Sequence, residues 1–597
     1  MRNRLLLCFW LLVLLAVPVA AAEWQILPLW GGDVRSLAIH PDDPDLVLAG
    51  TSGGQLYLSK NGGRTWADAG VHLPFPGWVV SDLRFDPNHP GRIWAALRGV
   101  WGGGHVASSD DLGKSWISRV KTGLPNDQVY TLALVPGREG HLYAGTATGV
   151  YGTTDGGDTW RPLTSDLPEV QKVTSLLVDS GQPDSVIAGT WRRAYRSNDA
   201  GKTWTGVFEG MVLDSEVFTL TPIPGKPGEI WATTCGWVYQ TQDGGGKWVR
   251  FKDGFEERRT PSFAALPGGR LLAGTVAGLH VSDDGGKTWK RMGDPGISIN
   301  EIAFHPKRPE RVLLATEGAG VWLSEDGGTS IRPSAGGMTN TRVSTLAKVN
   351  GEMLVGLSHA GPFSGLHLSK DGGQTFGDLS FLPTVLDVAV HSGRIFAATE
   401  GGIFERRGNG WHWVRDLGTG RVEQLVPGPT LVARTPSALY DFRGKIFVKR
   451  EFKHGAPRSA VFYGDALWVT DSTGVYRLTA KTNDTIPVPA PGGRLLPLAD
   501  QLLLWGPAGT WIRTGTEGEW QEVSKEPSRV LPTGDARYSA LMVSGETVRL
   551  FDRESRKFEK IDVPVPARDI SSALVMDGKL FVGTSGYGVL AKALGEG

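Results

Sequence analysis

Short hydrophobic runs separated by glycine-rich turns repeat along most of the chain. In the first such unit, Val34 to Gly70, the runs are VRSLAIH, LVLAG, QLYLS and RTWADAG. Pro-Asp, Ser-Gly-Gly and Asn-Gly-Gly stand between them and are turn and hairpin signals. Runs of this length are too short for independent helices and favour strands. Each unit is therefore predicted to be four antiparallel strands, the sequence form of one β-propeller blade.

A polar motif that ends on a large hydrophobic ring or side chain closes the first eight units. The copies are SKNGGRTW, SDDLGKSW, TTDGGDTW, SNDAGKTW, TQDGGGKW, SDDGGKTW, SEDGGTSI and SKDGGQTF, and they are spaced by 41 to 50 residues. An internal repeat with this period is typical of propellers and related repeat architectures. The repeat therefore predicts the architecture before any single residue is interpreted.

The units continue after the polar motif fades. An inner pattern of an apolar run, Gly-Thr or Ala-Thr, a glycine turn and an apolar-aromatic pair gives fourteen units in all. Because propellers have four to eight blades, two rings of seven are the natural division. We predict an all-β chain of tandem seven-bladed β-propellers, with a signal peptide at 1–22, a first propeller at 23–335 and a second at 336–597.

The two ends of the mature chain each look like an incomplete unit. WQILPLWGG, from Trp24, resembles an outermost strand without a blade, and the last unit, ending KALGEG, lacks its outermost strand. The last blade is thus expected to be closed by the N-terminal strand, because a propeller must remove its open edge. An open alternative places the last unit in the first ring, with the second ring inserted between.

The first residues predict export. Arg2 and Arg4 precede an apolar run from Leu5 to Val19, and Ala20 to Ala22 form a small-residue cleavage pattern. This arrangement is typical of a cleaved secretory signal peptide, although an uncleaved membrane anchor is the alternative. No second run of this kind follows, so we expect a secreted or periplasmic protein without a membrane span after processing.

The composition of the chain bears on its partners and on what stabilises its fold. The 62 basic and 62 acidic residues balance, which does not favour a nucleic-acid partner. Only two cysteines are present, and Cys8 lies in the predicted signal peptide, so Cys235 has no internal partner for a disulfide. The 82 glycines and 22 tryptophans suit tight turns and large packed rings.

The aspartates of the polar motif have a local structural explanation. Each can accept backbone N–H bonds within its turn, the glycines can take positive φ, and the final ring can anchor the outer strand. Eight equivalent positions, one of them Asn61, cannot all be catalytic. We assign a structural role in the turn to Asp155, Asp199, Asp243, Asp284, Asp326 and Asp371.

The same residues match the Asp-box, or BNR repeat, of sialidases and related propellers. With a box in nearly every blade of one ring and a second ring behind it, the chain resembles two-propeller xyloglucanases, sortilin-type receptors and photosystem II stability and assembly factors. The resemblance covers most of Glu23 to Phe376 and is specific for architecture, because one fold hosts many functions.

The resemblance to xyloglucanases implies a position at which a catalytic aspartate is expected. Those enzymes carry an aspartate in a Thr-Asp-Ile-Gly-Gly-like context, but here the stretch from Thr51 reads TSGGQLY and Ser52 occupies that position. A hydroxyl cannot serve as the ionised base. The Arg-Ile-Pro motif of sialidases is also missing from the sequence. Glu317 and Glu400, in inner-hairpin loops, are the weak catalytic candidates if the chain is a glycoside hydrolase.

Other motifs with chemical meaning are missing from the sequence. It contains no His-Glu-x-x-His, no Cys-x-x-Cys and no phosphate-binding loop after a strand. We therefore expect no metal and no cofactor.

Aromatic residues and arginines in the loops of the first ring are the candidate ligand contacts. Flat rings suit sugars or partner side chains, and neighbouring arginines suit carboxylates. The alternative is that the rings cap the blades as packing. The candidates are Trp78, Trp101, Trp191, Arg192, Arg193 and Trp237.

We therefore expect an exported, monomeric, non-catalytic propeller protein that binds a protein or a polysaccharide on the loop face of its first ring. The alternatives are a xyloglucanase-like glycoside hydrolase and an assembly factor for a membrane complex, which would carry an exposed apolar or arginine-rich patch.

Overall fold

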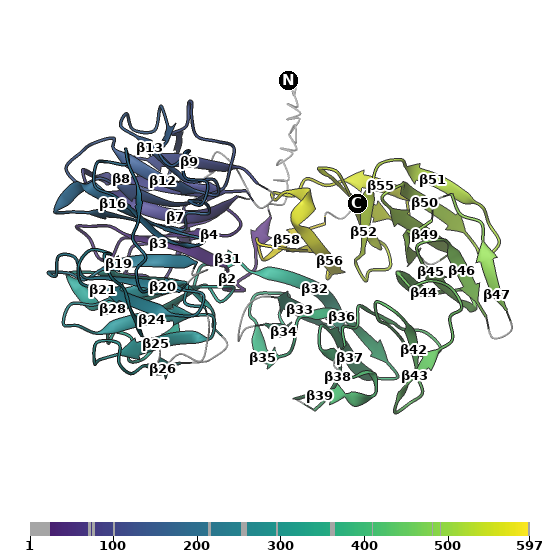
Figure 1. Cartoon of the computed structure of the whole chain (residues 1–597). Helices are drawn as coiled ribbons and strands as arrows, with labels where there is room; N and C mark the ends of the chain where they lie inside the picture. The colour runs from purple at the N-terminus through teal and green to yellow at the C-terminus, as the bar shows by residue number, and fades with distance from the viewer. Residues whose placement is uncertain are drawn as a thin grey trace, which may run out of the picture.

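The computed structural model describes residues 24–69, 73, 78–99, 102–212, 216–251, 259–293, 297–358, 364–408, 410–418, 420–479, 482–489, 491–498 and 500–594. In this part of the chain nearly all regular structure is β, arranged as fourteen four-stranded antiparallel sheets and one two-stranded parallel sheet. Figure 1 shows the sheets in two bodies, one built from the N-terminal half and one from the C-terminal half. The all-β prediction is confirmed.

The first body contains seven sheets, each made of four strands consecutive in sequence. Sheets one to four are β3 (Val34–Ile39), β4 (Val47–Thr51), β5 (Leu56–Ser59), β6 (Ala67–Asp68); β7 (Val79–Asp86), β8 (His89–Arg98), β9 (Gly104–Ser109), β10 (Ile117–Ser118); β11 (Val129–Leu134), β12 (Leu142–Thr146), β13 (Val150–Thr153), β14 (Arg161–Pro162); β15 (Ser175–Asp179), β16 (Gln182–Thr190), β17 (Arg193–Ser197), β18 (Thr205–Gly206). Sheets five to seven are β19 (Val217–Pro222), β20 (Ile230–Thr234), β21 (Val238–Thr241), β22 (Val249–Phe251); β23 (Ser262–Ala265), β24 (Leu271–Thr275), β25 (Gly278–Ser282), β26 (Lys290–Met292); β27 (Ile299–His305), β28 (Arg308–Thr316), β29 (Val321–Ser324), β30 (Arg332–Pro333).

The second body also contains seven sheets. The first four are β32 (Arg342–Val349), β33 (Glu352–Ser358), β34 (Gly365–Ser369), β35 (Gly377–Phe381); β36 (Val385–His391), β37 (Arg394–Thr399), β38 (Gly402–Arg407), β39 (Gly410–Val414); β40 (Gln424–Val426), β41 (Val432–Arg434), β42 (Leu439–Phe442), β43 (Phe447–Arg450); β44 (Ser459–Tyr463), β45 (Ala466–Thr470), β46 (Val475–Leu478), β47 (Asn483–Ile486). The others are β48 (Arg494–Leu498), β49 (Gln501–Gly506), β50 (Gly509–Thr514), β51 (Trp520–Ser524); β52 (Ser528–Pro532), β53 (Ala540–Ser544), β54 (Thr547–Asp552), β55 (Lys557–Lys560); β56 (Ile570–Met576), β57 (Lys579–Thr584), β58 (Val589–Ala593) and the N-terminal β1 (Gln25–Ile26). Two 3₁₀ helices, η2 (Arg415–Leu417) and η3 (Ala567–Asp569), lie in the connections.

The sheets of each body follow one another in a closed cycle. In the first body the innermost strands pack in the order β3, β7, β11, β15, β19, β23, β27 and back to β3. In the second body β32, β36, β40, β44 and β48 pack in turn, β49 then contacts β52, and β56 contacts both β52 and β32. In such a cycle each sheet has a neighbouring sheet on both faces, so the apolar side chains on both faces are buried.

The chain ends meet in the second body. Gln25 of β1 pairs with Ala591 of β58, and Ile26 pairs with Leu590, both antiparallel. The sheet that contains the last unit thus packs within the second body, unlike the alternative in which it completes the first ring. The first body is closed differently, because Trp66 donates its Nε1–H to the Ser334 carbonyl at 2.8 Å. β2 (Gly31–Gly32) and β31 (Thr339–Asn340) pair in parallel between the two bodies.

The recurrent Gly-Thr pair has a steric and a hydrogen-bonding cause. A Cβ added at Gly50 would lie 2.5 Å from Val80 of the next sheet, and one at Gly189 would lie 2.7 Å from Val217. Glycine is therefore needed for adjacent sheets to approach. The following threonine closes the inner hairpin, as when Thr275 Oγ1 donates to the Gly278 carbonyl at 3.0 Å.

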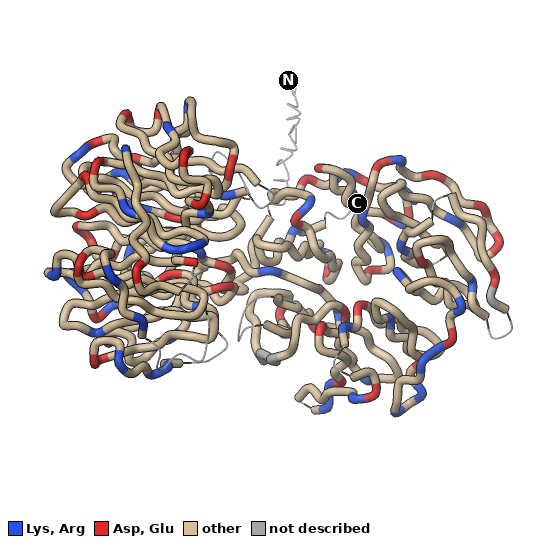
Figure 2. Tube along the Cα trace, in the orientation of Figure 1, with Lys and Arg blue, Asp and Glu red and all other residues tan. Residues whose placement is uncertain are grey.

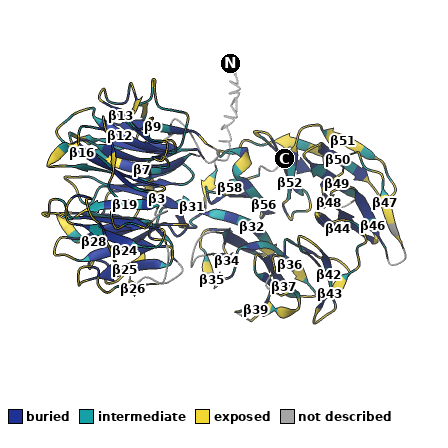
Figure 3. Ribbon diagram, viewed as in Figure 1, coloured by how far each residue is buried: buried dark blue, intermediate teal, exposed yellow. Residues whose placement is uncertain are grey.

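The core lies between neighbouring sheets, not in one central mass. One cluster joins Val34, Val47 and Tyr57 of the first sheet to Leu313 and Leu323 of the seventh. Figure 3 shows the buried residues along the inner and middle strands, with exposure concentrated at loops and outer strands. Among the described residues, no helix has the length and apolar character needed to cross a membrane.

Candidate binding face

One face of the first body collects the inner-hairpin loops and the starts of the innermost strands. The first two strands of each sheet are antiparallel, so the start of β3 at Val34 lies beside the end of β4 at Thr51. The connections that enter the innermost strands therefore reach the same face as the loops that follow the second strands. This is the face on which the sequence placed the candidate ligand contacts.

A cavity of about 330 Å³ opens in the middle of this body. Every innermost strand or its approach contributes to the lining, which includes Arg35, Asp82, Arg84, Tyr130, Thr174, Phe218, Ser262, Asn300 and Glu301. The lining is mostly polar. A second cavity of about 590 Å³ is lined by the far ends of several of these strands, including Ile39, Phe85 and Pro224.

A cluster of two exposed and two partly buried side chains, which we name the rim cluster, lies two residues along the chain from the cavity-lining Thr174 and Phe218. It consists of Lys172, Trp191, Glu216 and Cys235. Lys172 Nζ lies 2.8 Å from Glu216 Oε1 and 4.0 Å from the centroid of the Trp191 ring. Trp191 exposes 48% of its surface, whereas the Glu216 side chain exposes 12%. An ammonium over an indole face is attractive, so Lys172 holds the exposed ring in place.

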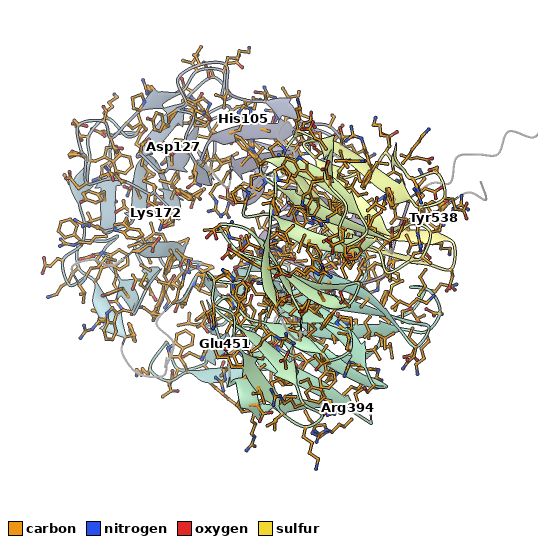
Figure 4. The ribbon with its side chains drawn as sticks, turned by 90° about the vertical axis from the view of Figure 1, so that its right-hand side faces the viewer. His105, Asp127, Lys172, Arg394, Glu451 and Tyr538 are labelled. Atoms are coloured by element: carbon orange, nitrogen blue, oxygen red, sulfur yellow. The ribbon has the colours of Figure 1, made fainter. Side chains whose placement is uncertain are left out.

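Local backbone geometry brings these residues together. Lys172 stands at φ 47, a conformation that side chains other than glycine rarely adopt, in the connection between β14 and β15. Its N–H donates to the Ala147 carbonyl at 2.8 Å, and the Trp191 N–H donates to the Gln171 carbonyl at 3.2 Å. The hairpin that follows β16 is thereby tied to the connection before β15. Figure 4 labels Lys172 in the same body as His105 and Asp127.

Cys235 is an exposed free thiol whose neighbours suppress its reactivity. Its Sγ lies 3.5 Å from Glu216 Oε2. Burial and the charge of Glu216 raise the pKa of the Cys235 thiol. Because the thiolate is the nucleophilic form, this thiol is poorly suited to covalent catalysis.

Two aromatic residues of the cavity lining are each contacted by an arginine outside the rim cluster. Arg259 Cζ lies 5.3 Å from the Phe218 ring centroid, and Arg98 Cζ lies 5.7 Å from that of Tyr130. Phe218 and Tyr130 both line the central cavity. Aromatic and cationic groups thus extend from the exposed rim into the cavity mouth, an arrangement that can bind ring-shaped or acidic groups.

The other candidate ligand contacts predicted from the sequence differ in how far they are exposed. Trp78 is partly buried against the core of the second sheet. Trp237 is also partly buried, with Arg250 Cζ 4.4 Å from its ring. Arg193 stands at φ 104 and packs 4.4 Å from the Phe208 ring, while Arg192 is exposed in the same hairpin. Trp101 lies outside the described residues.

The two weak catalytic candidates lie in different bodies. Glu317, before β29, is 3.4 Å from Arg35 in the first body. Glu400, between β37 and β38, pairs with Arg421 in the second body. Each carboxylate lies beside an arginine that it shares with a second acid, Asp33 for Glu317 and Glu423 for Glu400. Because they lie in different bodies, Glu317 and Glu400 do not form the carboxylate pair that hydrolysis of a glycoside requires.

The carboxylates of the central cavity, Asp82 and Glu301, were not among the residues predicted from the sequence. Glu301 Oε2 accepts the Leu37 N–H at 2.7 Å, and Asp82 Oδ2 accepts the Leu132 N–H at 2.9 Å. Arg84, whose side chain keeps 48% of its surface exposed to the cavity, pairs with Asp82 at 2.8 Å. Burial raises the pKa of Glu301 to about 7, and the positive charge of Arg84 opposes this increase.

These cavity carboxylates join neighbouring sheets. Each accepts an N–H from the innermost strand of the next sheet, and Asp387 of the second body does the same with the Leu425 N–H at 2.8 Å. Their strands share the pattern of an apolar residue, one further residue and then the acid, as in Val80-Ser81-Asp82. That repeated acid is the sequence signal that could have found them.

The Asp-box turns share one hydrogen-bond pattern. Asp199 Oδ1 accepts the Ser197 hydroxyl and the Thr203 N–H, both at 2.8 Å, and its Oδ2 accepts the Thr203 hydroxyl at 2.6 Å. These bonds lower the pKa of Asp199 to about 2, the Thr203 hydroxyl first among them. Equivalent bonds from the preceding hydroxyl and the N–H four residues on are made by Asp155, Asp243, Asp284, Asp326 and Asp371.

Within the described ranges, no group of three or more His, Cys, Asp or Glu side chains is placed to hold a metal ion.

Two families match parts of the chain. Residues 119–254 match the family described as photosynthesis system II assembly factor YCF48, and residues 280–291 match the BNR/Asp-box repeat. The first match contains the whole rim cluster. No curated protein sequence matches the chain.

Solved structures with a similar fold cover almost the whole chain. An ancestral GH74 enzyme aligns with a TM-score of 0.72 at 15% identity, over 97% of this chain and 99% of its own. The GH74 enzyme of Niastella koreensis aligns with a TM-score of 0.68 at 15% identity, over 95% and 99%. PorZ, a surface component of the type-IX secretion system of Porphyromonas gingivalis, aligns with a TM-score of 0.60 at 13% identity, over 96% and 87%. The chain therefore carries BNR/Asp-box repeats, resembles the GH74 structures in fold and, in residues 119–254, matches the photosystem II assembly factor family, as its sequence motifs predict.

Proposed function

We propose that the chain is an exported, non-catalytic binding platform made of two seven-bladed propellers, in which the first propeller presents its rim cluster to a protein or polysaccharide ligand. The observation that carries this proposal is Trp191, which is 48% exposed and held from one side by Lys172. An exposed indole held against a cation presents a flat, ordered surface to a sugar ring or a partner side chain.

Export and a monomeric state are part of the same proposal. The similar fold of PorZ, a protein described as a bacterial surface component, supports an extracytoplasmic location. In the described part of the chain the outer edge strands have only two to five residues, and such short edges offer little backbone to a second copy, which supports a monomer.

A glycoside hydrolase is the second candidate, because GH74 enzymes share the fold over nearly the whole chain. The hydrogen bonds of the carboxylates argue against it. Asp82 and Glu301 accept backbone N–H groups from neighbouring sheets, and Glu317 and Glu400 pair with arginines. Asp82 and Glu301 do line the same cavity, but each already accepts a backbone N–H, and Asp82 also pairs with Arg84.

The test measures binding and hydrolysis on the same preparation, residues 23–597, with xyloglucan and xanthan as probes. Affinity electrophoresis is expected to show retardation by one probe that is lost on Trp191→Ala and weakened by Lys172→Met. The matched control is Trp413→Ala, because Trp413 is a 39% exposed tryptophan of the second body that also lies near an arginine.

Reducing-end release is measured in parallel. Reducing-end release by the wild type would overturn the non-catalytic proposal in favour of the hydrolase. Loss of release in Glu317→Gln, in Glu400→Gln, or in Asp82→Asn and Glu301→Gln would then identify the carboxylates responsible. If neither probe is retarded, a photo-crosslinker at position 191 in cells tests the protein ligand. Equal cross-linking from positions 191 and 413 would contradict the binding face.

A further inference from the structure

A cavity of about 520 Å³ that is lined by three arginines lies in the second body. Its residues, between 423 and 507, are distant in sequence from the rim cluster. Three consecutive sheets line it, those that begin with β40, β44 and β48. In the right-hand body of Figure 1 they are found by the labels β42, β44 and β49, one in each sheet. The lining residues that matter here are Glu423, Arg434, Arg458, Ser472, Arg494 and Trp505. They come from inner-hairpin loops and from the approaches to innermost strands, so the cavity opens on the loop face of this body.

The lining carries three arginines and one carboxylate, and their partners differ. The Arg434 side chain is 4% exposed; its Nη1 lies 2.6 Å from Glu423 Oε2, and its Nε donates to Gln424 Oε1 at 3.1 Å. Arg421, outside the lining, lies 3.0 Å from the other oxygen of Glu423. The charge of Glu423 is thus shared by two arginines.

Arg458 and Arg494 have no carboxylate partner in the described part of the chain. Arg458 Nη1 donates to the Gly492 carbonyl at 3.2 Å, which leaves its other N–H groups directed to solvent or ligand. Arg494 Cζ lies 5.9 Å from the Trp505 ring centroid. Both side chains are exposed, and both stand at the cavity. Two arginines that line one cavity and pair with no carboxylate among the described residues favour an oxyanion, because guanidinium groups bind carboxylates and phosphates in a bidentate manner.

The wall that presents Arg458 is built before any ligand arrives. Asp471 Oδ2 accepts the Gly455 N–H at 2.8 Å, and its Oδ1 accepts the N–H groups of Thr473 and Gly474. The His454 ring stacks on Tyr476 with 3.7 Å between centroids. The segment before Arg458 is therefore fixed from both sides, which reduces the entropy lost on binding.

We propose that this cavity is a binding site for an acidic sugar, whose carboxylate or phosphate group contacts Arg458 and Arg494 while its ring lies against Trp505. The volume is in the range of small-molecule sites. Trp505 supplies a flat apolar surface, and Ser472 and backbone groups supply hydrogen-bonding partners along the same wall. The site lies outside the first body, so it is independent of the rim cluster and of the function proposed for it.

The test is calorimetric titration of residues 23–597 with four probes: glucuronate, glucose 6-phosphate, glucose and inorganic phosphate. The first two distinguish a carboxylate from a phosphate source of the oxyanion. At least one of them is expected to bind at least about tenfold more tightly than glucose and than inorganic phosphate, because sugar and anion are recognised together. Binding is also expected to weaken as salt is raised.

The variants are Arg458→Gln and Arg494→Gln, each expected to weaken binding by about tenfold. Arg415→Gln is the matched control, because Arg415 also lies near a tryptophan, 6.0 Å from the Trp413 ring, but does not line the cavity. Trp505→Phe is expected to weaken glucuronate more than inorganic phosphate. Circular dichroism and the thermal midpoint establish that each variant is folded.

Four results would overturn the proposal, and the first three concern the acidic sugars and the variants. They are no binding by either acidic sugar to the wild type, equal affinity for glucose, and equal losses in Arg415→Gln and Arg494→Gln. Inorganic phosphate bound as tightly as glucose 6-phosphate would also overturn it, because the site would then recognise an anion without a sugar.

Discussion

The two bodies build the same four-stranded sheets from different outer turns. In the first body every sheet has an Asp-box, whereas in the second only the sheet of β32 to β35 has one, at Ser369 to Phe376. Sheets without the box still pair in full register, as β45 does with β46 from Leu467 to Thr470. The box is therefore a local stabiliser of a turn, and the apolar strand pattern with its inter-sheet contacts is what both bodies need.

The closures differ as well. The first body is closed by contacts between contiguous sheets and by the bond from Trp66 to Ser334, while the second needs β1 from the other end of the chain. Figure 1 shows β58 beside the point where the chain enters the first body. Charges do not separate the two bodies, since Figure 2 shows acidic and basic residues interspersed over both.

The largest expected effect is on the closure of the second body. Leu29 is 3% exposed and packs with Val343, Leu357 and Phe581. Leu29→Ala is expected to lower the free energy of unfolding by about 2–5 kcal/mol because it leaves a cavity. Hydrogen exchange should show lost protection in β56 to β58 and unchanged protection in β11 and β12. Ile26→Ala is the control, since Ile26 is 49% exposed; equal loss in both bodies would contradict separate closures.

A smaller effect is expected from one box of the first body. Asp155 Oδ1 accepts the Thr153 hydroxyl at 2.7 Å and the Thr159 N–H at 2.9 Å. Asp155→Ala is expected to cost about 1–2 kcal/mol in chemical denaturation because both donors lose their acceptor. Asp155→Asn should keep most of the stability, as Asn61 fills the same position in another copy and accepts equivalent bonds. An alanine variant as stable as the wild type would mean that the box is dispensable in this body too.

The smallest effect compares the buried acids that join sheets in each body. The pKa of Glu301 is raised to about 7 and that of Asp387 to about 6, both chiefly by burial. In each case the folded state binds the proton more tightly than the unfolded state, so stability present at low pH is lost as pH rises through the folded pKa.

Glu301→Gln is therefore expected to flatten the decline in stability between about pH 5 and 7, by about 1 kcal/mol or less because Glu301 borders an open cavity. Asp387→Asn should act in the same direction over a lower pH range. Denaturant midpoints measured from pH 4 to 8 check both, and an unchanged slope in Glu301→Gln would show that this carboxyl ionises normally.

Most of the local architecture could be predicted from residues near one another in sequence. The run-and-turn rhythm predicts the strands, and the box predicts bonds such as those of Asp199, because donors and acceptor lie within six residues. The site was less accessible. Trp191 could be predicted as a loop tryptophan. Lys172, which contacts its ring, and Glu216, which pairs with Lys172, lie in connections of different sheets and belong to no recognisable motif.

The sequence by itself thus determined the all-β class, the repeat and the turns, because strand formation and hairpin chemistry depend on spacings of two to about forty residues. Only the tertiary structure decided which ends meet and which charges remain unpaired. The pairing of Gln25 with Ala591, and the gathering of Arg434, Arg458 and Arg494 from three sheets around one cavity, depend on how the sheets close into a cycle. No short-range pattern encodes such contacts, because the side chains that meet are separated by whole sheets of intervening chain.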